Sequence, residues 1–211
     1  MGGVDENAQT TEVSPERKKV FAAVFADAIE VVEGEDLPYV VGGSLASMQW
    51  GRPTSIGDID IIISPPDAKR LLGAFDAAGY ETDEPEPQWL YKAKKDDITV
   101  DLIFQMQGDL FLDDAMVERG QLRDIEGTKA RVMPPEDFIV SQAMSAREDT
   151  PDYWYNALGV LARSDLDWDY LVERASRSPR RVLSLLVFAE SNDLSVPDTA
   201  IRSLFLELYG R

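Results

Sequence analysis

The sequence predicts an α+β fold in which a small core with a mixed sheet is followed by an all-helical C-terminal domain. Short apolar runs rich in Val and Ile, such as Ile59–Ile63, alternate with helical periodicity in the first part of the chain. From Pro134 onward every periodic segment has helical spacing. The chain has 211 residues, 44% of them hydrophobic, which is enough to bury a core. We therefore expect a flexible acidic tail at residues 1–13, an α/β core at 14–133 and a helical domain at 134–211.

The α/β core begins with a helix that Ser14 and Pro15 start, because a capping hydroxyl precedes a proline in the first turn. Gly34 ends this helix, and Gly79 ends a later one that a Pro-Pro pair introduces. Two apolar strands on either side of Lys95–Asp97 predict a hairpin. In order, we expect helix 15–34, strand 39–41, helix 45–50, strand 59–63, a helix ending before Gly79, a loop at 82–88, strands 89–94 and 98–104, helix 112–119 and strand 128–132.

The C-terminal part predicts five helices, at residues 136–147, 152–163, 168–176, 179–191 and 198–209. The first 13 residues are polar and acidic and have no apolar stretch of the kind that a signal peptide needs. No segment approaches the run of about 18 apolar residues that crosses a bilayer. We therefore expect a cytoplasmic protein without a membrane partner.

Histidine and cysteine are both absent from the chain. Their absence excludes Ser-His-Asp triads, imidazole bases, cysteine nucleophiles and metal sites built from His or Cys. Any catalysis must therefore use carboxylates, hydroxyls, Lys, Arg or a metal held by oxygen ligands. The 39 acidic and 21 basic residues give a net charge of −18, which disfavours wrapping around a nucleic acid. A salt-adapted source and an ordinary acidic protein both fit this charge.

A glycine-rich turn follows the strand that ends at Val41. Gly42 and Gly43 let backbone N–H groups approach a phosphate closely, and the hydroxyl of Ser44 adds a donor at the start of the next helix. The same residues also fit an ordinary turn without a ligand.

Three aspartates interrupt apolar strands. Asp58 and Asp60 are two residues apart, so their carboxylates leave one face of the strand about 6.6 Å apart along it. Asp101 is the only charged residue of the run Ile98–Phe104. A bound divalent cation offsets the repulsion and lost hydration of such acids, although a strand end where they reach water is the alternative. If the two strands are neighbours, the oxygen ligands suit Mg²⁺ or Mn²⁺ and indicate metal-assisted phosphoryl or nucleotidyl transfer.

The pattern Gly42–Ser44, Asp58–Asp60 and a later lone Asp101 resembles the nucleotidyltransferase superfamily of DNA polymerase beta type. Arg52–Thr54 is similar to the Arg-x-Thr that many small members place before the paired acids. Within the superfamily the chain most resembles the bacterial abortive-infection-type proteins, some of which are toxins and which also carry a helical C-terminal half. The motif resemblance covers residues 38–104, and the likeness of the helical half is looser.

The resemblance implies a magnesium-dependent (or manganese-dependent) enzyme that moves a nucleoside monophosphate from a nucleoside triphosphate to an acceptor hydroxyl. Gly42, Gly43 and Ser44 would bind the triphosphate, while Asp58 and Asp60 would hold the metal ions. Pyrophosphate would leave. The acceptor stays open between RNA, a protein side chain and a small molecule such as an aminoglycoside.

The remaining roles that the resemblance implies are less well defined. Asp101 would complete the second metal site and help to deprotonate the acceptor hydroxyl. Arg52, Lys92 and Lys94 are candidates to neutralise phosphate charge, although a solvated surface position fits each of them as well.

The helical half departs from the abortive-infection pattern, whose members often carry lysines on the first two C-terminal helices. Here no lysine follows Lys129, and Arg147 and Asp152 are the nearest substitutes, which leaves the acceptor chemistry rather than the metal site open. The basic cluster fits tRNA or another RNA, or equally a helix junction paired with acidic residues. Its members are Arg174, Arg177, Arg180 and Arg181. An antitoxin-like partner protein is a further expectation.

Two alternatives to the enzyme hypothesis remain. In one, the chain is a catalytically degenerate nucleotidyltransferase-fold protein that binds a nucleotide or a partner protein. In the other it is a salt-adapted structural protein whose Asp58, Asp60 and Asp101 lie far apart and are merely solvated.

Overall fold

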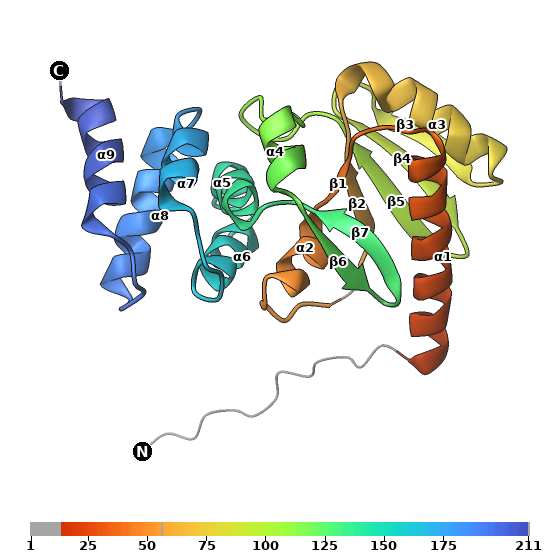
Figure 1. Cartoon of the computed structure of the whole chain (residues 1–211), viewed down its shortest axis with the longest axis horizontal. Coiled ribbons are helices and arrows are strands. Elements are labelled where there is room, and N and C mark those ends of the chain that lie inside the picture. The colour runs from red at the N-terminus through yellow and green to blue at the C-terminus, as the bar shows by residue number, and fades with distance from the viewer. Residues whose placement is uncertain (1–13, 56, 211) are drawn as a thin grey trace.

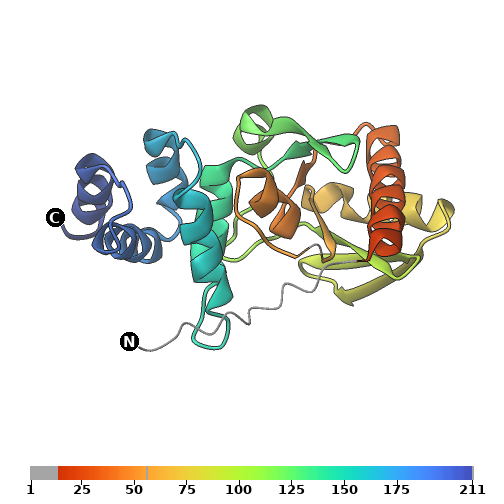
Figure 2. The same ribbon diagram turned by 90° about the horizontal axis from the view of Figure 1, so that it is seen from below.

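A computed structural model describes residues 14–55 and 57–210. The flexible tail predicted at residues 1–13 lies outside the described residues. The described chain is elongated: the sheet and helix α1 (Pro15–Gly34) lie at one end and α9 (Asp198–Tyr209) lies at the other (Figure 1). The same arrangement is seen from below in Figure 2. The predicted α+β class is confirmed.

One mixed sheet of seven strands organises the described part of the first half, in the order β3-β4-β5-β2-β1-β7-β6. The pairs β2·β5 and β1·β7 are parallel, and the other neighbours are antiparallel. The strands are β1 (Val40–Val41), β2 (Ile59–Ile62), β3 (Glu81–Glu86), β4 (Leu90–Lys95), β5 (Ile98–Ile103), β6 (Gln121–Ile125) and β7 (Thr128–Val132). Strands β2 and β5 are therefore interior neighbours, away from both sheet edges.

The alternation of β5 places its polar residues on one face. Ile98, Val100 and Leu102 are buried, whereas the residues between them are only half-buried. Asp96 and Asp97, with φ of 49° and 59°, form the two-residue turn between β4 and β5. Both central residues of a type I′ turn need positive φ, so this is the tight hairpin that the sequence predicts.

Two edge elements differ from the prediction. The expected loop at 82–88 is wrong, because Glu81–Glu86 forms the edge strand β3, paired with β4 through a register shift between Asp83 and Glu86. All but one of its residues are exposed, so no apolar alternation signals it, and it is held by backbone pairing with β4 and by the ion pair of Glu84 with Lys69 on α3. Strand β6 was not predicted either, since Leu122 is exposed and only Ile125 is buried.

The helices of the first half support the sheet. The hydroxyl of Ser14 accepts from the N–H of Arg17 at 3.2 Å and caps α1, as the Ser-Pro pair predicts. Helix α1 packs against α3 (Ala68–Ala77) and the sheet, with Phe21 and Phe25 fully buried. The other elements are α2 (Gly43–Gln49), the 3₁₀ turn η1 (Pro65–Asp67) and α4 (Asp114–Arg119).

The five predicted C-terminal helices are all present, within two residues of their expected ends. They are α5 (Pro135–Ser145), α6 (Asp152–Leu161), α7 (Trp168–Ala175), α8 (Pro179–Ser191) and α9. Helix α5 is almost wholly buried because it contacts α2 on one side and α6, α7 and α8 on the others. No helix in residues 14–55 and 57–210 combines the length and the apolar character that a transmembrane segment requires.

Candidate active site

Two of the predicted aspartates are direct neighbours on adjacent strands. Because β2 and β5 are parallel and in register, Asp60 lies beside Asp101, just as Ile59 lies beside Val100. Residues paired in this way leave the same face of the sheet, with strands about 4.8 Å apart. The structure therefore brings together two carboxylates that are 41 positions apart in the sequence.

The third aspartate, Asp58, immediately precedes β2 and is exposed. Its charge raises the pKa values of both Asp60 and Asp101, so it lies within electrostatic reach of the pair. The structure thus places all three acids in one region, two of them inside the sheet and one at its border.

The electrostatics of the pair are unbalanced. Burial, then the charges of Asp101 and Asp58, raise the pKa of Asp60 to about 7. Burial also raises the pKa of Asp101, against the opposing effect of Lys92. Lys92 on β4 faces Asp101 in the strand register, and its Nζ donates to Asp101 Oδ1 at 2.7 Å. One ammonium therefore acts on two neighbouring carboxylates, and negative charge is left over.

The glycine turn approaches Asp60 from the neighbouring strand. The N–H of Gly42 donates to the carbonyl of Asp60 at 2.9 Å. Gly43 has a φ of 54°, and a Cβ at this position would overlap the Asp60 carboxylate. A side chain is therefore excluded here twice, by backbone conformation and by the space that Asp60 occupies.

Two serine hydroxyls next to this turn have no partner among the described residues. The Oγ atoms of Ser44 and Ser47 are buried, and the whole Ser47 residue is only 2% exposed. Both residues line the same cleft as Gly43 and Asp60. Since a buried hydroxyl without a hydrogen bond is unfavourable, this part of the cleft is suited to a polar ligand.

The cleft has a volume of about 730 Å³ and lies between the sheet and helices α5 and α6. Arg52 lines it and packs against α6, where a Cβ at Gly159 would overlap its side chain. Trp89 and Tyr153, each 40% exposed, also line it. Its polar neutral lining comprises Ser44, Ser47, Thr54, Gln105, Gln107, Ser141, Gln142, Ser145, Thr150 and Asn156. A cleft of this size and chemistry fits small-molecule ligands.

The donor set fits a hard divalent cation. Within the described ranges no group of three or more acidic residues is already arranged to hold a metal ion. Asp60 and Asp101 nevertheless offer adjacent oxygen ligands on one sheet face, and their surplus negative charge favours a cation. Lys92 already donates to one oxygen of Asp101.

The predicted basic cluster is mostly engaged within the chain. Arg174 is buried and donates through Nε to Asp137 and through Nη1 to Asp113, both at 2.5 Å. Arg177 donates to the carbonyl of Asp109, and Arg181 to that of Ala146. Arg174 therefore belongs to an internal ion network, and this part of the structure favours the helix-junction alternative over RNA binding.

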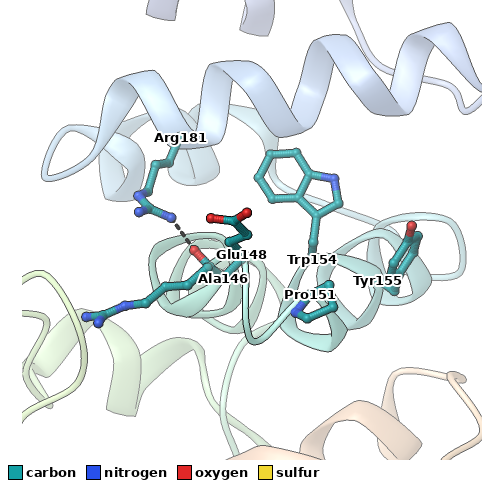
Figure 3. A pocket seen from close by; sticks show the side chains of 7 residues that line it. Ala146, Glu148, Pro151, Trp154, Tyr155 and Arg181 are labelled. Atoms are coloured by element: carbon teal, nitrogen blue, oxygen red, sulfur yellow. Dashed lines mark hydrogen bonds between the residues drawn. The ribbon is translucent and has the colours of Figure 1, made fainter.

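A second hollow, of about 410 Å³, lies outside the main cleft between the α5–α6 turn and α8. Figure 3 shows Trp154 beside it and Arg181 donating to the Ala146 carbonyl across it. Arg147 lines both this hollow and the main cleft. The Gly42–Ser44 turn and the aspartates are absent from the residues that line it, so it is separate from the site.

Sequence reasoning missed Ser47 and the polar lining from α5 and α6. Ser47 follows Ser44 by three positions, which places both on one helix face, and this spacing could have signalled it. Gln142, Ser145 and Asn156 belong to no recognisable sequence motif. They line the cleft only because α5 and α6 pack beside the sheet.

Comparison with known proteins identifies the family. Residues 22–174 match the model of a family described as nucleotidyl transferase of unknown function, DUF2204. The match spans most of the chain, and the chain belongs to this family. A search of curated proteins found no relative of this sequence. The predicted nucleotidyltransferase superfamily and enzyme class are thereby confirmed, while the closer likeness to abortive-infection-type proteins stays a prediction.

The search of solved structures gave similar chains at low identity, one of which has a TM-score above 0.5 and shares the fold. The antibiotic-resistance factor ANT(2″)-Ia in solution is 14% identical, with 82% of this chain and 99% of that chain covered and a TM-score of 0.52. A putative nucleotidyltransferase of Thermotoga maritima is 17% identical over 55% of this chain and 78% of its own, with a TM-score of 0.43. The Megavirus polyadenylate synthase is 14% identical over 96% of this chain and 51% of its own, with a TM-score of 0.40.

Proposed function

We propose that this member of the nucleotidyl transferase family transfers a nucleoside monophosphate from a nucleoside triphosphate to a hydroxyl of a small polar acceptor, with the aid of Mg²⁺ or Mn²⁺. The observation that carries the proposal is Asp60 at the wall of a cleft of about 730 Å³, beside the Gly42–Ser44 turn and in register with Asp101 on the neighbouring strand. The alternative with widely separated acids does not fit this pair.

The triphosphate would lie against the glycine turn. Ser44 and Ser47 offer buried hydroxyls without partners, and Gly43 leaves room for close approach. Arg52 on the same cleft wall would neutralise phosphate charge, since a guanidinium can donate two parallel hydrogen bonds to phosphate oxygens. These residues would bind and orient the nucleotide.

Asp58, Asp60 and Asp101 would hold the metal ions. When bound, such ions stabilise negative charge on the attacking and leaving oxygens of an in-line displacement. Asp101 lies beside Asp60 on the neighbouring strand, and burial raises its pKa, so its carboxylate would take the proton of the acceptor hydroxyl. The acceptor oxygen then bonds to the α-phosphorus, the bond to the bridging oxygen breaks, and pyrophosphate leaves.

The far half of the cleft favours a small acceptor over a polynucleotide. Amide and hydroxyl groups from α5 and α6 line it, together with Trp89 and Tyr153. The charged residues of the whole cleft are Arg52 and Arg147 against Asp60, Asp109 and Asp149, which is too little positive charge for a phosphate-rich chain. Neutral donors and acceptors flanked by aromatic rings instead suit a molecule with several hydroxyl groups.

Transfer of label tests this proposal. The full chain is incubated with Mg²⁺, α-³²P-labelled nucleoside triphosphates and, separately, polyhydroxylated small molecules, tRNA and a protein extract. We expect label on a small molecule and none with the Asp60→Asn variant. Label on tRNA or protein would contradict the acceptor class. Nucleotide binding without any transfer would support the degenerate, nucleotide-binding alternative.

An antitoxin-like partner protein stays a prediction of the resemblance, and the transfer assay should be repeated if such a partner is found.

A further inference from the structure

The position of Lys92 is fixed by the sheet rather than by a loop. Strand β4 is paired with β5 along its whole length, and this pairing sets Lys92 directly opposite Asp101. The Nζ atom lies 2.7 Å from Asp101 Oδ1, and the side chains of Lys92 and Asp101 are 35% and 14% exposed. The ammonium therefore rests on a largely buried carboxylate.

Lys92 is also the cation that acts on the acidic site as a whole. Its charge favours the ionised forms of both Asp60 and Asp101, against burial and the repulsion between the acids. A divalent cation bound to Asp60 and Asp101 would do the same with twice the charge. Since Lys92 already donates to Asp101 Oδ1, a divalent cation at Asp101 would have to share this carboxylate with it.

We infer that Lys92 is a built-in counter-ion of the metal-free site, which holds Asp101 in place and competes with the divalent cation for it. Lys92 thereby sets the metal concentration at which the site loads. This inference rests on the proposed function, and it replaces the expected role of Lys92 in binding nucleotide phosphate. It makes Lys92 a positioning residue rather than a catalytic one.

Lys94 provides a matched control on the same strand. It lies two residues from Lys92 and so on the same strand face, opposite Thr99 instead of Asp101. Its side chain is 50% exposed and pairs with the exposed Asp97. Replacing Lys94 removes the same charge from nearly the same place without releasing an aspartate of the site.

The experiment measures Mn²⁺ binding to the full chain at pH 8, above the pKa of about 7 of Asp60. Free Mn²⁺ is quantified by electron paramagnetic resonance for the wild type, Lys92→Gln, Lys92→Arg and Lys94→Gln. We expect Lys92→Gln to lower the Kd for Mn²⁺ about tenfold, because a competitor and a repelling charge are both removed. Lys94→Gln and Lys92→Arg should stay within about twofold of the wild type.

Unchanged or weaker Mn²⁺ binding by a folded Lys92→Gln variant would overturn the inference. If its nucleotide affinity alone fell, Lys92 would be a phosphate ligand and the proposed function would stand. If neither protein bound Mn²⁺, with or without a non-hydrolysable nucleoside triphosphate, the metal site of the proposed function would fail as well. Thermal unfolding checks each fold, and Lys92→Met, which also removes the charge and should lower the Kd to a similar extent, provides a second test if Lys92→Gln does not fold.

Discussion

Two groups of buried or half-buried aspartates in this chain are neutralised in different ways. In the helical half, Asp137 is fully buried, and Arg174 and Tyr170 donate to it, while Arg174 also pairs with Asp113. In the sheet, Asp60 and Asp101 share one half-exposed ammonium, and nearby serine hydroxyls have no partner in the described part of the chain.

The difference indicates a structural role for the Asp137 group and a ligand-binding role for the Asp60 group. The Asp137 network connects α4, α5 and α7, and its carboxylate oxygens are satisfied by protein groups. Within this network, the Nη2 atom of Arg174 is the one buried side-chain donor that lacks a partner among the described residues. The Asp60 site has surplus negative charge and unpaired donors facing a cleft. The first group is suited to hold helices together, and the second to receive a cation and a phosphate.

The largest expected effect on stability comes from breaking the ion network around Asp137. Replacement of Arg174 by Met leaves Asp137 buried without its cation, so we expect the free energy of unfolding to fall by about 3–5 kcal/mol. Denaturant titration measures this loss. The exposed Arg180 is the control, and Arg180→Met should change stability by less than about 0.5 kcal/mol. Equal effects of the two variants would show that Asp137 does not depend on Arg174.

At the site of Asp60 and Asp101, a substitution should reduce activity rather than stability. Asp101→Asn removes a negative charge from a repulsive group, so we expect unchanged or higher stability and nucleotidyl transfer reduced on the order of a thousandfold. Label transfer and denaturant titration of one preparation measure the two quantities. Asp97→Asn, an exposed turn position that tolerates asparagine, should leave both unchanged. A large loss of stability with Asp101→Asn would place this aspartate with the structural network instead.

A smaller effect is expected at the glycine turn. In Gly43→Ala the new Cβ overlaps the Asp60 carboxylate, so we expect a loss of about 2–3 kcal/mol in stability and a loss of nucleotide binding. Gly127→Ala is the control, because Gly127 also has positive φ but nothing lies near its Cβ position. Its stability should fall by only about 1 kcal/mol. If both variants lost the same amount, backbone strain alone would explain the glycine.

The smallest effect concerns pH. The pKa of Asp60 is raised from its ordinary value of 3.8 to about 7 in the metal-free fold. At pH values between these two, Asp60 is protonated in the folded chain and ionised in the unfolded chain. The folded state then binds more protons, so the free energy of unfolding falls as pH rises through this window and levels off above it. Asp60→Asn should make this slope shallower, because Asp137, whose pKa is raised to about 6, keeps its own contribution. Denaturant titrations at several pH values, each compared with the variant, measure it; identical slopes would contradict the raised pKa.

The sequence predicted those helices whose ends are marked by capping residues and those strands in which buried and exposed side chains alternate. Ser14 and Gly34 marked the ends of α1, and Ile98, Val100 and Leu102 gave the buried face of β5. Such signals are local, because burial of one face selects residue types at fixed spacing. The grouping of Asp58, Asp60 and Asp101 also followed from residue types, once their strands were assumed to be neighbours.

What the sequence could not give depends on partners distant in the chain. Nothing near Lys92 shows that it faces Asp101, because this contact follows from the β4–β5 register. Strand β3 is exposed and acidic, so only its pairing with β4 reveals it. The sequence around Arg174 does not distinguish it from an exposed arginine, and only its tertiary contact with Asp137 takes its side chain out of solvent.

Calorimetric titration of Mg²⁺ and a non-hydrolysable nucleoside triphosphate into the wild type and an Asp58→Ala/Asp60→Ala variant tests the central claim most directly. The proposed site predicts metal-dependent nucleotide binding by the wild type and its loss in the variant, with the fold intact by circular dichroism. Equal binding by the two proteins, or no binding by the wild type at low and at molar salt, would contradict it.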